Sequence, residues 1–338
     1  MTAFADHHQL AQLPYFDLVD GRLRLDPAFG PIVDVHTHLA LDYLTGHVDL
    51  TAEHAHVEHY LDQSRPIDLD VYINKNFSAA DLRKMERDLT LLSFTSRGMR
   101  RTHTAPNLAR EMTELSVETS VLLAIDFPYL SRNTERWLAA ARGHGELVCF
   151  GSVHPFHPGI EARLDRLVAL GIRGIKMHPA VQMVPPDHPR TLRLVRACGD
   201  RGLPLFFHCG PVEIETAIGR RFSQVARYER AIAEHPQTTI ILGHSGALQV
   251  EQGIALANRY PNVWLETASQ SLPSHRRLVA EAPSERLMLG SDWPFYHQST
   301  TIAKALLATE GEPAIRRGLL RDNARRLFSS VGSPRRVS

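Results

Sequence analysis

The chain has 338 residues, of which 43% are hydrophobic and 22% are charged, and its 38 basic residues balance 37 acidic ones. This composition is typical of a globular protein, and the length suits either two average domains or one large α/β barrel. The near-zero net charge argues against a surface for nucleic acid or for membrane lipids. No apolar run approaches the length of a membrane span, and the N-terminus lacks the pattern of a signal peptide.

Three cysteines, Cys149, Cys198 and Cys209, are few for a chain of this length. Such usage indicates reduced thiols rather than a disulfide framework, so we expect a cytoplasmic protein. The unusual number in the composition is the 19 histidines. They suggest a metal site.

Residues 1–30 are expected to form an N-terminal arm. Within this arm the stretch YFDLVDGRLRL places Asp20-Gly21 between two alternating runs, which is the pattern of a short β-hairpin. From residue 31 onward, short apolar runs rich in β-branched residues alternate with amphipathic helical patterns. The expected strands are 31–38, 119–126, 147–155, 171–179, 203–210, 238–246, 262–269 and 286–294.

Near-continuous hydrophobicity in these runs fits strands that are buried on both faces, as in a parallel sheet covered by helices. Helical patterns at 159–171 and 191–202 close on glycine, as a helix C-cap does. Strand-helix units repeated in this way predict one (β/α)₈ TIM barrel over residues 31–330, ending in an amphipathic helix over 314–330. The interval after the first strand is too long for one helix, so we expect a helical insertion over 40–112 that covers the barrel mouth.

The stretch DVHTH at the end of the first strand carries two histidines one residue apart. Residues i and i+2 point to the same face of a strand, so His36 and His38 are expected to converge. The pair His54 and His56 has the same spacing but falls in TAEHAHVEHYLDQ, a helical pattern, where such residues diverge by about 200°. The first pair is therefore the candidate for metal binding, and the second is expected to be solvated.

Other ionisable residues also stand where buried strands end. Active sites of these barrels gather at the C-terminal ends of the strands, so these side chains should meet there. Imidazoles with one carboxylate form a nitrogen and oxygen site for zinc or a similar divalent ion, which polarises a carbonyl and activates water. The strand-end residues are His36, His38, Lys176, His178, His208, His244 and Asp292.

The motifs DVHTH, GIKMHP, FFHCG, ILGHSG, LGSDWPF and NARRLF occur in this order, and they resemble the amidohydrolase superfamily from about residue 31 to 328. The similar branch contains aminocarboxymuconate-semialdehyde decarboxylase and many metal-dependent hydrolases. The resemblance implies that four residues ligate the metal: His36, His38, His208 and Asp292. It also implies that Asp292 acts as general base or acid, and that His244 lies beside the metal and steadies developing charge.

Two residues on the fourth strand have further candidate roles. In binuclear relatives a carboxylated lysine at the position of Lys176 bridges two metals, but we favour a cation that contacts the substrate. His178 shares the face of Lys176 by the i, i+2 rule and is a second candidate for contacting the substrate. Glu266 and Asp126 end two other strands and are candidates for orienting the ligand histidines.

Decarboxylases of this branch often carry Glu-x-His on the first strand, whereas this chain has His-x-His, which favours hydrolysis. The sequence thus predicts hydrolysis of an amide, ester or lactone carbonyl in a small molecule, through a metal-activated water. The alternative is non-oxidative decarboxylation of an aromatic or unsaturated acid. We expect one divalent ion, Zn²⁺ or else Mn²⁺, a small-molecule substrate, and no nucleic-acid or membrane partner, with a homodimer as one candidate assembly. A nuclease or phosphoesterase, and a barrel that only binds ligands, are more distant alternatives.

Overall fold

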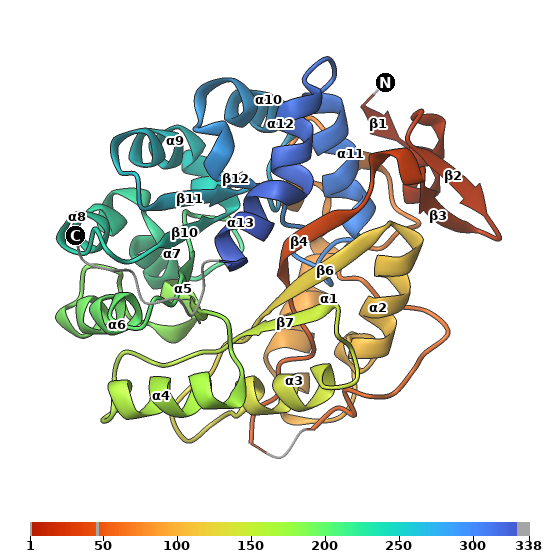
Figure 1. Cartoon of the computed structure of the whole chain (residues 1–338). Coiled ribbons are helices and arrows are strands. Elements are labelled where there is room, and N and C mark those ends of the chain that lie inside the picture. Colours follow the sequence, from red (N-terminus) through yellow and green to blue (C-terminus); the bar gives the residue numbers. More distant parts are fainter. Residues whose placement is uncertain (1, 45–46, 330–338) are drawn as a thin grey trace.

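The computed structural model describes residues 2–44 and 47–329, and a parallel β-barrel stands at its centre (Figure 1). Two sheets form the wall, one with the order β4-β6-β7 and the other with the order β8 to β12. Parallel bridges from Gly151 to Ile175 and from Thr37 to Trp293 join the sheets on both sides. The eight described barrel strands are β4 (Ile32–Thr37), β6 (Val117–Leu123), β7 (Leu147–Phe150), β8 (Ile175–Met177), β9 (Leu205–His208), β10 (Ile240–Gly243), β11 (Val263–Glu266) and β12 (Leu287–Met288).

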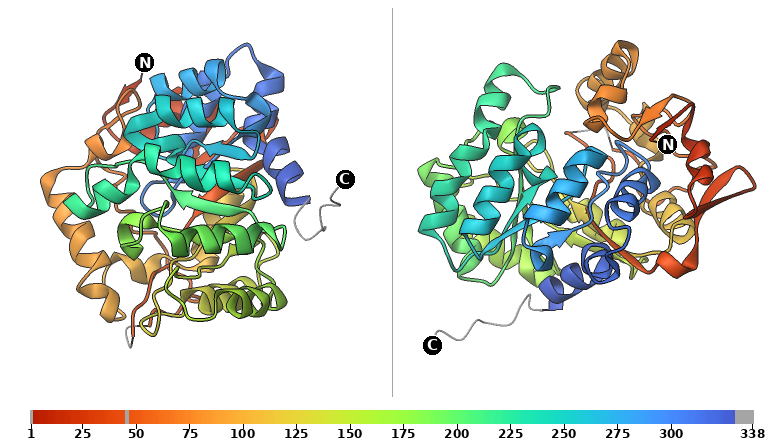
Figure 2. Two further views of the ribbon diagram at one scale, coloured as in Figure 1. Left: turned by 90° about the vertical axis from the view of Figure 1, so that its left-hand side faces the viewer. Right: turned by 90° about the horizontal axis from the view of Figure 1, so that it is seen from above.

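Helices surround this wall, so the predicted TIM-barrel fold is confirmed (Figure 2). The outer helices are α2 (Ala105–Glu114), α3 (Asn133–Ala141), α4 (Ile160–Leu170), α6 (Pro189–Gly199), α8 (Glu229–Glu234), α9 (Val250–Arg259), α10 (Leu272–Glu281) and α11 (Gln298–Ala308). Shorter helices are α5 (Pro179–Gln182), α7 (Ala217–Ser223), α12 (Pro313–Arg317) and α13 (Asn323–Ser329). Short 3₁₀-helical segments span His7–Gln12, Pro27–Phe29, Ile73–Asn76, Leu92–Phe94, Met99–Thr102, Val225–Tyr228, His244–Gln249 and Ser284–Arg286. The segment His244–Gln249 is not a regular helix, because Ser245, Gly246 and Ala247 within it have non-helical dihedral angles.

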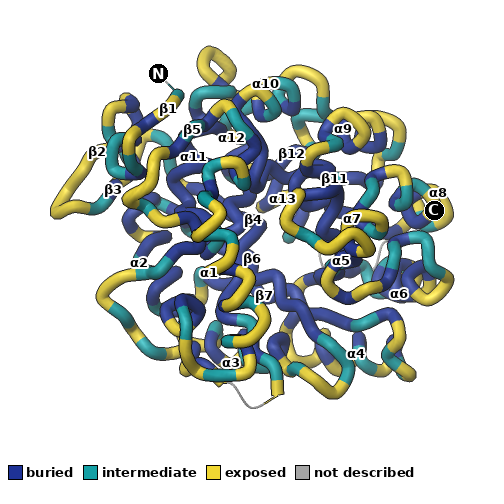
Figure 3. The backbone as a smooth tube through the Cα atoms, turned by 180° about the vertical axis from the view of Figure 1, so that it is seen from behind, coloured by how far each residue is buried: buried dark blue, intermediate teal, exposed yellow. Residues whose placement is uncertain are grey.

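The barrel interior is filled by apolar side chains from different strands. Val33, Val121, Phe150, Phe206 and Ile241 belong to one buried cluster, although they come from five strands. Only the lumen of a closed barrel brings such residues together. Figure 3 shows the strands as a buried centre ringed by partly exposed helices. The lumen is therefore a packed core beneath the site, not a channel.

The predicted N-terminal hairpin is present. Strands β2 (Phe16–Val19) and β3 (Arg22–Leu25) pair antiparallel, and Asp20 and Gly21 both have positive φ at the turn. Positive φ at both central residues is the hallmark of a type I′ turn, which matches the twist of the strands. A second pair, β1 (Ala3–Phe4) with β5 (Ile67–Asp68), ties the arm to the segment after β4.

The long segment between β4 and α2 packs on loops at the C-terminal ends of the strands. Backbone N–H groups of Tyr60 and Leu61 bond to the carbonyls of Pro294 and Phe295, which follow β12. Its helix α1 (Ala79–Leu89) starts with a complete capping box at Ser78. Helix α2, at the end of the predicted 40–112 insertion, instead packs on β6 as an ordinary barrel helix does.

Two local predictions are wrong in detail. The segment carrying His54 and His56 is not helical, because its backbone N–H groups find distant partners: His54 bonds to the Asn107 side chain and Glu58 to Thr102. These contacts replace the local bonds of a helix. The final helix, predicted over 314–330, is interrupted by a π-helical turn over Gly318–Asp322, and residue 330 lies outside the described residues. Among the helices described, none has the length and apolar character needed to span a membrane.

Candidate metal centre

Two imidazole rings from β4 and a carboxylate from the segment after β12 meet at the C-terminal end of the barrel. The Nε2 atoms of His36 and His38 lie 3.2 Å apart. Asp292 Oδ1 lies 3.4 Å from His36 Nε2 and 3.3 Å from His38 Nε2. All three residues are buried, and their atoms form a compact group that could hold an ion. The convergence expected for this histidine pair is thus present.

Hydrogen bonds on the far side of each ring indicate where the protons are. His38 Nδ1 lies 2.9 Å from the carbonyl oxygen of Leu123, which can only accept, so Nδ1 carries a proton and, in the neutral ring, Nε2 has the lone pair. His36 Nδ1 lies 2.8 Å from Glu266 Oε1. Burial, and then the charge of Lys176, hold the pKa of His36 well below its usual 6.5.

Two lone pairs and a carboxylate oxygen therefore face one another without a proton between them. This arrangement is repulsive by itself, and a cation at the common centre would make it attractive. Neutral imidazoles whose other N–H is held by a carboxylate or carbonyl are the usual ligands of zinc. The residues present thus fit a divalent metal ion.

Glu266, the last residue of β11, orients this group as expected. Besides the His36 ring, its carboxylate accepts the backbone N–H groups of His244 and Ala268. Burial raises the pKa of Glu266, while the hydrogen bonds from the backbone N–H groups of His244 and Ala268 and then the charge of Lys176 oppose this rise. His36, His244 and Glu266 form a second group compact enough for a metal. The hydrogen bonds that Glu266 accepts, however, already explain why these three residues lie close together. We therefore place the ion at the Asp292 group.

The parallel expectation for Asp126 is wrong. Its carboxylate accepts hydrogen bonds from the backbone N–H groups of Asn133 and Thr134 and from the hydroxyls of Ser131 and Thr134. These are the free donors at the start of α3, so Asp126 satisfies a helix N-terminus. It contacts none of the candidate ligands.

The remaining predicted histidines lie beside the central group. His244 Nε2 is 3.1 Å from His208 Nδ1, and His244 Nδ1 is 3.3 Å from the carbonyl oxygen of Ala268. His208 in turn stacks on His178, with ring centroids 3.9 Å apart. If His208 Nδ1 donates to His244, His208 Nε2 keeps a lone pair and can serve as a ligand. His208 is nevertheless one ring removed from the compact group, so its role as a ligand stays a prediction.

Both ring nitrogens of His244 are engaged by these contacts. Burial lowers the pKa of His244 to about 4, so the ring is neutral at pH 7. A neutral ring with both nitrogens engaged has no free N–H to offer an oxyanion. The predicted role of His244 in stabilising developing charge would therefore require its hydrogen bond with His208 to break.

The turn that carries His244 is conformationally strained. Four consecutive residues, His244 to Ala247, have positive φ. The left-handed region is unfavourable for residues other than glycine, and such strain persists only where neighbours enforce it. Gln270 provides the restraint, since its side-chain NH₂ donates to the carbonyls of His244 (2.6 Å) and Ala247 (2.8 Å). Buried Lys304 then donates to the Gln270 carbonyl at 2.6 Å.

Lys176 points its ammonium over the Phe206 ring, with Nζ 4.4 Å from the ring centroid. It is fully buried, and Nζ has no hydrogen-bond partner among residues 2–44 and 47–329. Burial lowers the pKa of Lys176 to about 8, and the charges of Asp292 and Glu266 partly offset this effect. An unsolvated cation beside the candidate centre is suited to receive negative charge.

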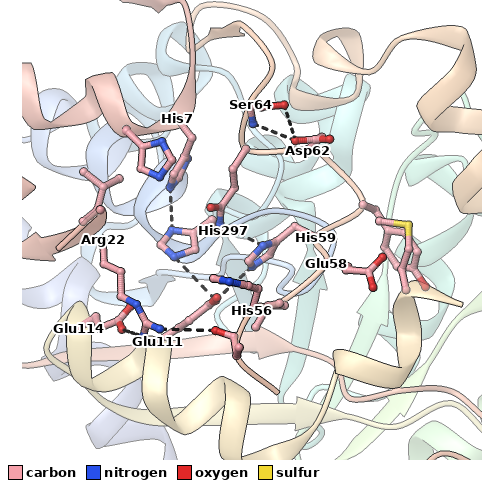
Figure 4. A pocket seen from close by; sticks show the side chains of 18 of the residues that line it. His7, Arg22, His56, Glu58, His59, Asp62, Ser64, Glu111, Glu114 and His297 are labelled. Atoms are coloured by element: carbon pink, nitrogen blue, oxygen red, sulfur yellow. Dashed lines mark hydrogen bonds and ion pairs between the residues drawn. The ribbon is translucent and has the colours of Figure 1, made fainter. Parts of the chain in front are cut away.

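A cavity of about 590 Å³ lies away from this centre, between the N-terminal arm and the long segment after β4 (Figure 4). Buried Glu111 is the hub of its polar wall. Glu111 Oε2 lies 3.1 Å from His59 Nε2 and accepts the indole N–H of Trp293 at 2.8 Å. His297 Nε2 is 3.7 Å away, and His7 Nε2 is 3.0 Å from His297 Nδ1. Because Trp293 follows Asp292, this network fixes the segment that carries the candidate ligand.

We expect Glu111→Gln to lower the free energy of unfolding by about 3 kcal/mol at pH 7. Burial acts to raise the pKa of Glu111, but electrostatic interactions with His59 and His297 and hydrogen bonds with His59 and Trp293 outweigh it, and the pKa falls from 4.5 to about 2. A carboxyl whose pKa is lowered by folding stabilises the protein above pH 4.5, and this stabilisation disappears as the pH falls toward 2.

Urea unfolding at several pH values measures this difference. The gap between wild type and Glu111→Gln should narrow below pH 4.5. Glu58→Gln is the matched control, because Glu58 lines the same cavity but its side chain is 38% exposed. A gap that does not change with pH would contradict the assignment.

Several residues at the centre were not predicted. Ser269 and Gln270 follow Glu266 at the end of β11, so the rule that strand ends carry functional residues could have found them. Asp34 accepts hydrogen bonds from the Ser291 hydroxyl at 2.5 Å and from the Gln298 side chain at 2.6 Å. The alternating pattern of its strand does not mark Asp34 as a functional residue. Its partners lie more than 250 positions away along the chain.

Comparison with solved structures finds the same architecture. A probable 2-pyrone-4,6-dicarboxylic acid hydrolase from Acinetobacter baumannii is 14% identical, with a TM-score of 0.56 over 89% of this chain and 100% of that one. The 5-carboxyvanillate decarboxylase LigW from Sphingomonas paucimobilis is 16% identical, with a TM-score of 0.56 over 72% and 90%. A zinc-bound amidohydrolase from Burkholderia multivorans is 15% identical, with a TM-score of 0.57 over 89% and 99%. At these identities the likeness shows the fold alone.

No curated protein matches the sequence significantly. The profile of the family described as Amidohydrolase, however, matches residues 33–329, from the strand that carries the histidine pair to the last described helix. That span contains the whole barrel and every candidate ligand. The chain therefore belongs to the amidohydrolase family of metal-dependent enzymes.

Proposed function

We propose that this protein hydrolyses an amide, ester or lactone carbonyl of a small molecule, with one divalent ion held by His36, His38, His208 and Asp292. The observation that carries the proposal is the group of two imidazole lone pairs and one carboxylate oxygen within 3.4 Å of one another. Zn²⁺ is favoured by this donor set, with Mn²⁺ as the alternative. A zinc-bound relative of the same fold supports this choice.

When bound, the ion would polarise the carbonyl and lower the pKa of a water molecule. Asp292 is suited to two tasks because its oxygens face different ways. Oδ1 faces the two histidines, whereas Oδ2 lies 3.5 Å from the Ser269 hydroxyl. We propose that Oδ2 takes the proton from the water whose oxygen bonds to the carbonyl carbon. It then delivers this proton to the leaving nitrogen or oxygen as the single bond from the carbonyl carbon to that atom breaks.

Lys176 and His178 are proposed to contact the substrate. The Lys176 ammonium would attract an anionic group, because it is buried without a hydrogen bond among the described residues. His178 stacks on His208 and lies at the start of α5, in the loop after β8. Both therefore border the centre from the side of β8 and β9.

Decarboxylation of an aromatic or unsaturated acid is the second candidate. The buried, unpartnered Lys176 ammonium favours it, since a substrate carboxylate would satisfy this cation. In that reaction the carbon–carbon bond to the carboxylate breaks, carbon dioxide leaves, and Asp292 Oδ2 delivers a proton to the carbon. A decarboxylase of the same fold supports this alternative.

A screen of metal-loaded protein against lactones, amides, esters and aromatic acids distinguishes the two. Acid release from a neutral carbonyl would support hydrolysis, and carbon dioxide release would support the alternative. Loss of both activities on chelation and recovery with Zn²⁺ would support metal dependence. Turnover that survives complete chelation would refute the proposal.

We expect Lys176→Met to retain one divalent ion per chain while losing activity. Methionine keeps most of the side-chain volume over Phe206 but removes the charge that would hold the substrate. Elemental analysis of dialysed protein, with turnover in parallel, makes the measurement. Two equivalents in wild type, falling to one or none in the variant, would instead indicate a binuclear centre with carboxylated Lys176.

A further inference from the structure

The segment between β4 and α2 reaches the candidate centre at residues 72–74. The backbone N–H of Ile73 donates to the carbonyl of Ser269 at 3.1 Å, and Asn74 Nδ2 donates to the carbonyl of Val212 at 2.8 Å. The Tyr296 hydroxyl donates to Asn74 Oδ1. These bonds lead to the loops after β11, β9 and β12, so the segment is fixed to three sides of the mouth.

Tyr72 precedes these anchors, and its side chain is buried with 7% exposure. It packs against Val212 and against Ala247, the last residue of the strained turn that carries His244. Burial raises the pKa of Tyr72 well above 10, and the electrostatic interactions with Tyr296 and then Asp292 raise it further. The hydroxyl is therefore protonated at neutral pH and lies within the electrostatic reach of Asp292.

The Tyr72 hydroxyl makes no hydrogen bond to any described residue. The Ser269 hydroxyl is close enough to lower the pKa of Tyr72, although the two hydroxyls do not reach the geometry of a hydrogen bond. A buried hydroxyl without a partner is unfavourable by about 1–3 kcal/mol, and such groups in folded proteins need an explanation. A ligand that supplies an acceptor would provide one.

We propose that Tyr72 is a substrate-binding residue whose hydroxyl donates a hydrogen bond to the substrate oxygen that lies beside Asp292. This inference rests on the proposed function and adds a contact to the same site. The oxygen belongs to the carbonyl in hydrolysis and to the carboxylate in decarboxylation, and both are acceptors. The proton stays on Tyr72, so no bond is broken there.

The polar groups described above do not already donate a hydrogen bond to this substrate oxygen. Both ring nitrogens of His244 are engaged, as are the carboxylate oxygens of Glu266. The Lys176 ammonium lies over the Phe206 ring. Tyr72 thus supplies a neutral donor from the side of the long segment, and substrate recognition would depend on a residue outside the barrel strands.

The test uses full-length protein loaded with Co²⁺ and the probe acetohydroxamate, a small carbonyl compound that binds such metals through its oxygens. Its dissociation constant is read from the visible spectrum of the cobalt. Tyr72→Phe removes only the hydroxyl and should weaken binding about tenfold, the loss expected for one hydrogen bond to a charged acceptor. Tyr60→Phe is the control, because its hydroxyl lies in the same segment but bonds to Asp88 at 2.7 Å.

Thermal unfolding of the same proteins separates binding from stability. Tyr72→Phe should melt at or above the wild-type temperature, since it removes an unsatisfied group, whereas Tyr60→Phe should melt lower. Equal affinity of wild type and Tyr72→Phe for the probe, or a lower melting temperature of Tyr72→Phe, would overturn the proposal for Tyr72 alone. Failure of wild type to bind cobalt would instead refute the metal-dependent function and withdraw this inference with it.

Discussion

Replacement of Asp292 by asparagine is expected to reduce turnover by about 10³-fold or more while the protein stays folded. The amide keeps the shape of the side chain and one oxygen donor, but it cannot accept a proton at neutral pH. The backbone should tolerate the change, because Asp292 has a φ of 66° and asparagine is among the residues that adopt this region most readily. Its backbone N–H bond to the His36 carbonyl, at 2.8 Å, is unaffected.

Three measurements on Asp292→Asn decide this prediction. The steady-state rates of wild type and variant are compared under saturating metal, so that weaker metal binding by asparagine is not mistaken for loss of the general base. The melting temperature and the metal content show whether fold and centre persist. Near wild-type turnover would exclude Asp292 as the group that moves the proton.

The second large effect concerns metal retention. His36→Ala and His38→Ala should each weaken binding of the divalent ion by more than about 100-fold, beyond the 10- to 100-fold typical of residues that only orient a ligand. The reason is that each removes one of three donor atoms lying within 3.4 Å of one another. His208→Ala should have the same effect if His208 is the fourth ligand.

The double variant His54→Ala/His56→Ala is the matched control, because it removes the same His-x-His spacing from a segment that does not border the centre. It should retain the metal. Equilibrium dialysis followed by elemental analysis measures the metal retained by these four variants and by wild type. Equal metal loss in the control would contradict the assignment, and full retention by His208→Ala would leave the ion with three protein ligands.

Local patterns in the sequence determined the barrel and the histidine pair. A strand buried on both faces needs a continuous apolar run, and a turn with positive φ needs a residue such as Gly21, so these features can be recognised within ten residues. The convergence of His36 and His38 follows from the alternation within one strand. The placement of Asp292 opposite them needed only the rule that parallel strands end at one face of the barrel.

Only the tertiary structure decided the features that depend on distant partners. The helical pattern around His54 did not form a helix because side chains of Asn107 and Thr102 capture its backbone N–H groups. The pairing of His244 with His208 and the buried position of Tyr72 likewise arise from loops that meet across the mouth. Such contacts join residues tens to hundreds of positions apart, and no period or spacing along the chain encodes them.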